Sequence, residues 1–138
     1  EEIAHALELV GLTSLVTELP KGLDTVVGEG GRSLSGGQSQ RVALARAVLH
    51  RTCRILVFDE PTAHLDIETE WELKQRMLPL MEGKLVFFAT HRLHWLSEMD
   101  EILLLEDGQV RDFGSYEALS KANSFAYLSS HEKEGGDV

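Results

Sequence analysis

Two short apolar runs constrain the fold of this chain more than any other feature. Residues 55–58 and Leu85–Ala89 each have the length of a β-strand and contain no polar side chain. Continuous apolar runs of this length are typical of parallel strands that are buried on both faces. The segment between them has a helical composition over residues 67–78 and can form the crossover helix that parallel strands require. We therefore predict an α/β fold with a largely parallel sheet.

The rest of the chain adds elements to this frame. Residues 102–105 predict a third strand, and Glu106-Asp107-Gly108 predicts a turn into an antiparallel strand at residues 109–112. Helical spacing of apolar residues, together with capping residues, predicts four further helices. These helices cover residues 2–10, 37–50, 93–98 and 115–122, where Ser115 is the expected cap. Residues 20–32 form a predicted loop that contains four glycines.

Composition excludes several classes of function. The formal charge is −10, from 23 acidic and 13 basic residues, whereas binding to nucleic acid requires a cationic face. The single cysteine, Cys53, cannot form an internal disulfide, which favours a reducing compartment. No apolar run approaches the roughly 20 residues that a membrane-spanning helix needs.

Two adjacent carboxylates follow the first apolar run. In parallel sheets, ligands bind beyond the carboxyl ends of the strands, which is where Asp59 and Glu60 are predicted to lie. Asp59 is suited to hold Mg²⁺ through its water shell, and Glu60 could act as a general base toward water. The alternative is that both residues simply open a solvated loop, and the sequence of this segment leaves both interpretations open.

A second candidate segment, Leu34-Ser35-Gly36-Gly37-Gln38, opens a predicted helix. The start of a helix offers unpaired N–H groups and the positive end of the dipole, which together bind phosphate. The glycines would let these amides approach a ligand closely, and the Ser35 hydroxyl adds a donor. An ordinary serine cap has the same composition, so this segment alone does not decide between the two.

The order of these segments resembles that of the ATP-binding cassette (ABC) ATPases. Residues 34–38 match the signature motif of the family letter for letter, and residues 55–60 match its Walker B strand. Residues 63–66 stand where the family has its D-loop, and His91 stands at the switch histidine. The resemblance covers residues 22–119, and residues 21–31 and 108–117 are similar to the exporter branch in particular.

The resemblance implies an α/β P-loop NTPase-like fold, with ATP and Mg²⁺ as cofactors. It implies that Asp59 assists Mg²⁺, that Glu60 is the catalytic base and that His91 contacts the γ-phosphate. A second set of residues would touch ATP held by a second nucleotide-binding domain: Ser35, Gly36, Gly37 and Gln38. Asp66 would lie at the same dimer interface. Nucleic acid is not an expected partner.

The chain also departs from the family pattern. Ala63-His64 replaces the usual Ser-Ala of the D-loop, and Ser39 replaces a frequent arginine. Nothing resembles the G-x-x-x-x-G-K-[ST] loop that cradles phosphates. We therefore expect the C-terminal half of a nucleotide-binding domain without its P-loop strand, inactive in isolation. It would comprise a signature-helix region (residues 1–50), a Walker B to switch-histidine core (51–122) and a tail (123–138).

The resemblance places a transmembrane domain upstream and the chain at the cytoplasmic face of the cell membrane, where ATP hydrolysis powers export. Residues 58–66 and 90–95 look similar to one bacterial branch, the heterodimeric cysteine/glutathione exporters needed for cytochrome bd assembly. Three alternatives remain: the ABC-type head of a DNA-repair or chromosome-maintenance ATPase, a soluble translation-associated ABC protein, and an inactive dimerisation half. The run Glu68, Glu70 and Glu72 is interpreted as a solvated helix face.

Overall fold

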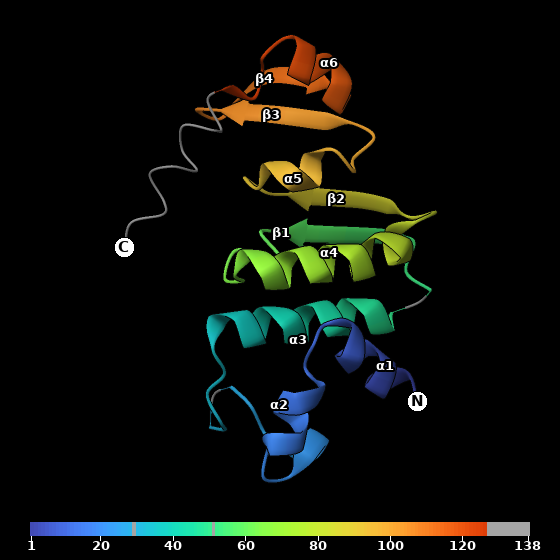
Figure 1. Ribbon diagram of the computed structural model, residues 1–138, viewed down its shortest axis with the longest axis vertical. Helices are drawn as coiled ribbons and strands as arrows, with labels where there is room; N and C mark the ends of the chain where they lie inside the picture. The colour runs from blue at the N-terminus through green and yellow to red at the C-terminus, as the bar shows by residue number, and fades with distance from the viewer. Residues whose placement is uncertain (29, 51, 127–138) are drawn as a thin grey trace. The chain divides into compact units, whose positions relative to one another are not determined.

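The computed structural model describes residues 1–28, 30–50 and 52–126, and it divides into two compact units, Glu1–Phe88 and a second unit that begins at Ala89. Glu29, Arg51 and residues 127–138, which include most of the predicted tail, lie outside the described residues. Each unit has its own small sheet (Figure 1).

The first unit is mostly helical. Its elements are α1 (Glu2–Leu9), α2 (Thr13–Glu18), the 3₁₀ turn η1 (Gly22–Asp24), α3 (Gly36–Leu49), β1 (Ile55–Asp59), α4 (Ile67–Met81) and β2 (Leu85–Ala89). The helices predicted at residues 2–10, 37–50 and 67–78 are confirmed, whereas the six-residue α2 was not predicted. Helix α4 continues two residues past Pro79, whose missing N–H costs the last turn one backbone hydrogen bond.

Strands β1 and β2 form a two-stranded parallel sheet and are joined through α4 (Figure 1). The rings of Phe58 and Phe88 lie 5.6 Å apart, and Phe58 borders the same cavity as Ala47 of α3 and Met77 of α4. This face of the sheet therefore packs toward the two helices. The predicted parallel pairing of these two strands is confirmed.

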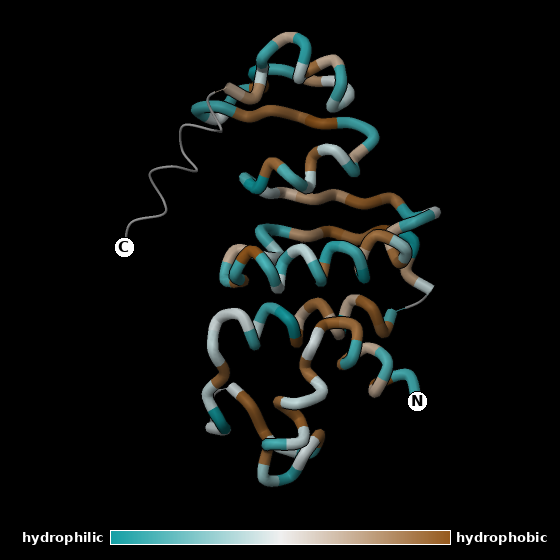
Figure 2. Tube along the Cα trace, viewed as in Figure 1, coloured by the Kyte–Doolittle hydropathy of each residue, from teal (hydrophilic) through white to brown (hydrophobic). Residues whose placement is uncertain are grey.

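The opposite face of this sheet is exposed. It carries four apolar side chains, which we call the apolar sheet face: Ile55, Val57, Leu85 and Phe87. Val57 is 72% exposed and Phe87 56% exposed, and Figure 2 shows both strands as hydrophobic. The prediction that both strands are buried on both faces is therefore wrong, because helices of this unit cover only the Phe58 side.

Helix α1 is attached to α3 and α4 through its carboxyl end. Arg41 of α3 donates from Nη1 to the Gly11 carbonyl at 3.0 Å. Arg76 of α4 donates to the carbonyls of Glu8 and Leu9 at 3.2 and 3.4 Å. The Glu8 and Leu9 carbonyls lie in the last turn of α1, where carbonyls lack partners inside the helix, and the Glu8 carbonyl also accepts from the Gly11 N–H. The two arginines therefore attach the end of α1 to α3 and α4.

The second unit contains α5 (Leu93–Leu96), β3 (Ile102–Glu106), β4 (Gln109–Gly114) and α6 (Tyr116–Lys121). Strands β3 and β4 pair antiparallel, as predicted. The expectation that residues 102–105 add a strand to one largely parallel sheet is wrong for the described residues, where β3 pairs with β4 in a separate sheet. A two-residue turn brings β4 directly alongside β3, and such local pairing needs no partner from the other sheet.

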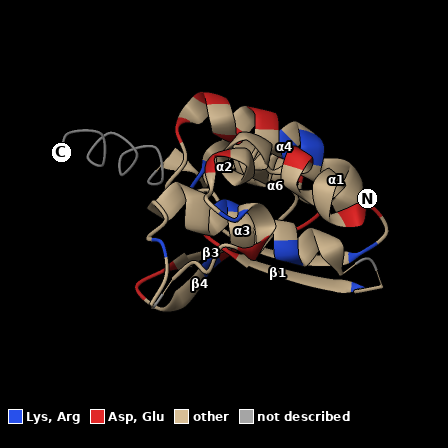
Figure 3. Cartoon of the chain, turned by 90° about the horizontal axis from the view of Figure 1, so that it is seen from below, with Lys and Arg blue, Asp and Glu red and all other residues tan. Residues whose placement is uncertain are grey.

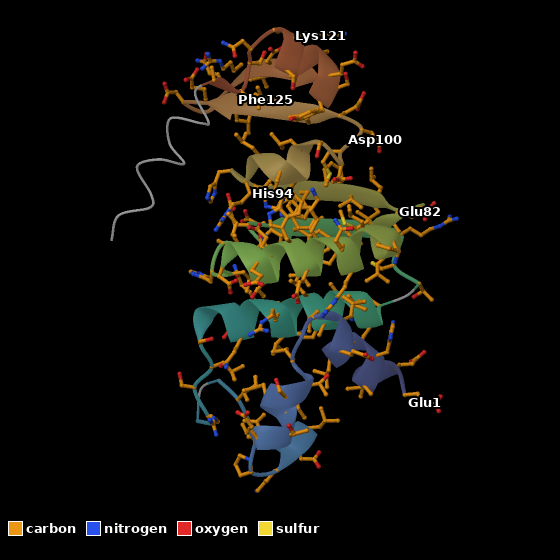
Figure 4. The ribbon with its side chains drawn as sticks, viewed as in Figure 1. Glu1, Glu82, His94, Asp100, Lys121 and Phe125 are labelled. Atoms are coloured by element: carbon orange, nitrogen blue, oxygen red, sulfur yellow. The ribbon has the colours of Figure 1, made fainter. Side chains whose placement is uncertain are left out.

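The core of the second unit is small and apolar. Leu96, Ile102, Leu104 and Leu119 are buried together, and Phe125, labelled in Figure 4, packs against them. Ser115 caps α6 by accepting a hydrogen bond from the Ala118 N–H, as predicted. Across the described part of the chain, no helix combines the length and the apolar character needed to cross a membrane.

Candidate functional site

Helix α3 begins with a complete capping box. The Ser35 hydroxyl accepts a hydrogen bond from the Gln38 N–H at 3.1 Å, and the Gln38 side chain accepts one from the Ser35 N–H at 3.0 Å. Ser35 is thus the N-cap, yet its O–H can still donate to a ligand because only the oxygen is used. Among the described residues, none accepts a hydrogen bond from the N–H groups of Gly36 and Gly37. They are the amides of this helix start that an anion could reach.

The two carboxylates lie at the carboxyl end of β1, as predicted. Asp59 is the last residue of the strand and is exposed. It borders an open cavity of about 220 Å³ together with Gln40, Leu44 and Pro61. A space of this size can hold several water molecules. An exposed carboxylate beside such a space fits a magnesium ion that keeps most of its water ligands.

Glu60 has a backbone conformation that is uncommon for its residue type. Its φ is +44°, in the left-handed region that glycine, asparagine and aspartate occupy more readily. Non-glycine residues in this region carry a conformational cost, and they occur often at active sites. The chain turns sharply here, and the Glu60 carbonyl accepts a hydrogen bond from the Ala63 N–H at 3.2 Å.

Gln40 connects α3 to this turn with both ends of its side-chain amide. Nε2 donates to the Glu60 carbonyl at 2.9 Å, and Oε1 accepts from the His64 N–H at 3.0 Å. The sequence did not point to Gln40, because a single polar residue on an amphipathic helix reads as solvent-exposed. Only the approach of residues 60–64 gives it partners.

A buried hydrogen bond also links the turn at residues 60–64 to α4. Thr62 and Glu70 are almost completely buried, and the Thr62 hydroxyl donates to a Glu70 carboxylate oxygen. Lys74 is also buried, with its Nζ 4.8 Å from the centre of the Trp71 ring. The interpretation of Glu68, Glu70 and Glu72 as one solvated face is therefore wrong for Glu70, which points into the unit. Figure 3 shows acidic residues along α4.

The segment at residues 63–66 packs onto the start of α3. A Cβ placed on Gly36 would lie 3.2 Å from Cγ of the His64 ring, and one on Gly37 would lie 3.1 Å from the His64 carbonyl oxygen. A Cβ at either position would be a tight contact that His64 must shift to accommodate, so glycine favours this close approach. The replacement of Ala by His64 puts an imidazole directly against the candidate anion-binding helix start.

Asp66 caps α4. Its Oδ1 accepts from the Thr69 N–H at 2.9 Å, and its Oδ2 accepts from the Thr69 hydroxyl at 2.7 Å. The bond from the Thr69 backbone, followed by that from the hydroxyl, lowers the pKa of the Asp66 carboxyl below its ordinary value. This structural role was not predicted, although Asp three residues before Thr, ahead of a helix, is a recognisable cap.

His91 belongs to the second unit and is exposed in the segment between β2 and α5. Beside it, the Thr90 hydroxyl accepts a hydrogen bond from the Arg92 N–H at 3.0 Å. The structure thus brings Ser35, Gly36, Gly37, Gln38, Asp59, Glu60 and Asp66 into one unit around α3 and the end of β1. The expected contact of His91 with the γ-phosphate stays a prediction.

Comparison with known proteins identifies relatives of this arrangement. Residues 1–63 match the family model described as ABC transporter. The chain is 58% identical over 123 residues to the glutathione/L-cysteine transport system ATP-binding/permease protein CydC of Bacillus subtilis (strain 168), covering 89% of this chain and 22% of the relative. It is 43% identical over 129 residues to an ATP-dependent lipid A-core flippase of Vibrio vulnificus (strain YJ016), covering 93% of this chain and 22% of the flippase.

A solved structure is similar as well. The chain aligns with a bacterial Atm1-family ABC exporter with ATP bound at a TM-score of 0.78 and 34% identity, covering 95% of this chain and 23% of the exporter. This chain therefore spans between a fifth and a quarter of the length of these three proteins.

Proposed function

The chain belongs to the ABC transporter family, and from this premise we propose that it forms part of an ATPase whose hydrolysis of ATP drives export across a membrane. The observation that carries the proposal is the hydrogen-bonded connection, through Gln40, between the helix that begins with the signature segment and the carboxyl end of β1. A phosphate-facing helix start and two catalytic-type carboxylates are thereby held in one unit.

Each site residue has a role in this proposal. Water attacks the γ-phosphorus of ATP, ADP leaves, and the Glu60 carboxylate accepts a proton from the attacking water molecule. Asp59 would hold Mg²⁺ through water, and the bound ion would supply positive charge beside the phosphates. His91 contacts the γ-phosphate. The capping of α4 by Asp66 orients the segment at residues 63–66, which faces the second domain.

A second nucleotide-binding domain completes the site. The N–H groups of Gly36 and Gly37 and the hydroxyl of Ser35 donate to the γ-phosphate of ATP held by that domain, while Gln38 keeps the helix start in shape through the capping box. A transmembrane domain is the other partner, which places the chain at the cytoplasmic face of the cell membrane. Hydrolysis needs a P-loop to hold the phosphates of ATP, and no segment of residues 1–138 resembles one. The chain alone is therefore expected to be inactive.

The cargo we propose is cysteine or glutathione. The support is the identity of 58% to a glutathione/L-cysteine transport system, against 43% to a lipid A-core flippase. Identity in the ATP-binding region reports on cargo only through common descent, because the site that selects a cargo lies elsewhere in a transporter. A transport measurement must therefore accompany the ATPase measurement.

The test uses a full-length subunit that carries this sequence, assembled in inverted membrane vesicles. Glu60→Gln should bind ATP normally but lower the hydrolysis rate by at least about 100-fold, because the amide cannot accept the water proton. ATP-dependent uptake of labelled cysteine or glutathione should be lost in parallel. Glu72→Gln, an exposed residue of α4 paired weakly with Arg76, is the matched control and should behave as wild type.

The outcomes separate the parts of the proposal. Normal hydrolysis in Glu60→Gln would exclude Glu60 as the base. Normal ATPase activity in wild-type vesicles that move lipid A and neither thiol would leave the ATPase standing and exclude the cargo.

A further inference from the structure

We propose that Gln40 is a positioning residue that couples the start of α3 to the backbone of Glu60. The inference rests on the proposed function, because it matters only if Glu60 is the base. It adds a physical connection between the face that meets ATP in the second domain and the residue that activates water. The contacts that carry it lie entirely within the first unit.

Both ends of the Gln40 side chain are engaged. Its Nε2 donates to the Glu60 carbonyl at 2.9 Å, and its Oε1 accepts from the His64 N–H at 3.0 Å. A carbonyl only accepts and an N–H only donates, so the orientation of the amide is set by its partners. The bond to the Glu60 carbonyl is partly buried, which reduces the competition from water for it, whereas the bond from the His64 N–H is exposed.

The hydrogen bond from Gln40 Nε2 is made to the carbonyl of Glu60, a residue with an unfavourable backbone conformation. Glu60 is held at φ +44°, and conformations of this kind persist only when surrounding contacts impose them. Within the turn, the Ala63 N–H bonds to the same Glu60 carbonyl at 3.2 Å. Gln40 is the contact that joins this carbonyl to a different element, α3.

The rest of the interface makes α3 and the turn move together. The His64 ring and backbone lie against Gly36 and Gly37, so close that a Cβ on either glycine would be 3.1–3.2 Å from a His64 atom. Gln40 lies one helical turn beyond these glycines. A phosphate that docks on the glycine amides and shifts the helix start will therefore also shift the Glu60 carbonyl.

Small displacements of a base have large kinetic effects. A misplacement of about 1 Å can lower a rate by about 100-fold, because the reacting groups must be aligned. Loss of the Gln40 contact should accordingly reduce kcat, while the binding of ATP should stay the same, because both ends of the Gln40 amide already bond to protein backbone. This split between kcat and KM distinguishes positioning from a general loss of structure.

The experiment compares three variants of the full-length subunit in its assembled transporter. Gln40→Ala should lower kcat for ATP hydrolysis by about 10- to 100-fold with KM unchanged within about twofold. Gln40→Glu keeps an acceptor for the His64 N–H but loses the donor to the Glu60 carbonyl, so it should show the same loss of kcat. Gln75→Ala removes an exposed glutamine from α4 and is the matched control with wild-type kinetics.

Amide hydrogen exchange supplies a readout that does not depend on activity. Exchange at the His64 N–H should accelerate in Gln40→Ala and stay slow in Gln40→Glu. If Gln40→Ala fails to fold, Gln40→Glu still decides the question because it retains the His64 bond. A wild-type kcat in Gln40→Glu, or an effect confined to KM, would overturn the inference.

A double variant separates this inference from the proposed function. If Glu60→Gln nearly abolishes hydrolysis, adding Gln40→Ala should not lower the residual rate further, since both changes act through the same base. Independent, multiplicative losses would overturn the role of Gln40 and leave Glu60 as the base. Full hydrolysis in Glu60→Gln alone would instead refute the proposed function, whatever Gln40→Ala does.

Discussion

Asp66, which the sequence predicts to lie at an interface, also caps the start of α4. The resemblance to ABC ATPases predicts that it lies between two nucleotide-binding domains, and in the structure it caps α4 through Thr69. The two roles are compatible, because the cap fixes the direction in which the chain leaves residues 63–66. A substitution at Asp66 will consequently disturb α4 as well as any interface.

The Asp66 cap predicts a pH dependence of stability. Bonds from Thr69 lower the pKa of Asp66 in the folded chain, so the ionised carboxylate favours folding. This stabilisation is present above the unfolded-state pKa of about 3.9 and is lost as the pH falls through the folded pKa. Asp66→Asn, which preserves a good cap, should make stability decline less steeply from pH 5 to pH 3.

The measurement is a series of urea titrations across that pH range. Asp112→Asn provides a comparison in the second unit, because bonds from the Ser124 hydroxyl and the Phe113 N–H also lower the pKa of Asp112. If the free energy of unfolding depends on pH in Asp66→Asn as it does in wild type, protonation of Asp66 does not contribute to the acid sensitivity of the fold.

At the scale of elements, the turn residues of the β3–β4 hairpin show directly why these two strands pair. Asp107 and Gly108 connect the paired residues Glu106 and Gln109, and both have positive φ, +50° and +74°. Two consecutive residues with positive φ define the type I′ turn that matches the twist of a hairpin. The Asp-Gly pair therefore sets the pairing of Leu105 with Val110, and a register shift between Leu104 and Leu105 then pairs Leu104 with Asp112.

Gly108→Ala should destabilise the chain by about 1 kcal/mol, because a Cβ is unfavourable in the left-handed region. Asp107→Asn is the matched control and should be nearly neutral, since Asn-Gly favours the same turn. The free energy of unfolding by urea compares the two. Equal stability of Gly108→Ala and wild type would contradict the turn assignment.

At the scale of the whole molecule, the exposed apolar surface is the most consequential feature. The apolar sheet face (Ile55, Val57, Leu85 and Phe87) has no cover within the first unit. In the second unit, the cross-strand pairs Leu103–Phe113 and Leu105–Val110 are exposed as well. Contiguous apolar surface of this kind favours association, and short sheets offer backbone groups at their edges for pairing.

We expect the 138-residue chain by itself to self-associate as its concentration rises. The double variant Val57→Lys/Phe87→Lys should shift the population toward monomer, because burying the new charges would be costly. Ile67→Lys/Leu23→Lys adds the same charge at exposed apolar positions away from the apolar sheet face and should leave association unchanged. Sedimentation equilibrium measures all three, and a wild-type chain that stays monomeric at every concentration would refute the expectation.

Local patterns in the sequence determined the elements of this protein and the type of its site. The apolar runs at β1 and β2, the helical stripe of α3, the Ser35 and Ser115 caps and the Asp107-Gly108 turn depend on neighbours within a few residues, so each was predictable. The carboxylates at the end of β1 were predictable for the same reason, because a strand end is a local feature.

Only the tertiary structure decided whether the predicted strand pairs join one sheet and which side chains meet across elements. Burial of β1 and β2 on one face, the separate pairing of β3 with β4, and the buried Glu70 depend on what packs against each element. The bridge from Gln40 to Glu60 spans 20 residues and requires α3 to lie beside the end of β1. Residue type and spacing carry no trace of such a contact, since its energy exists only once the two segments are brought together.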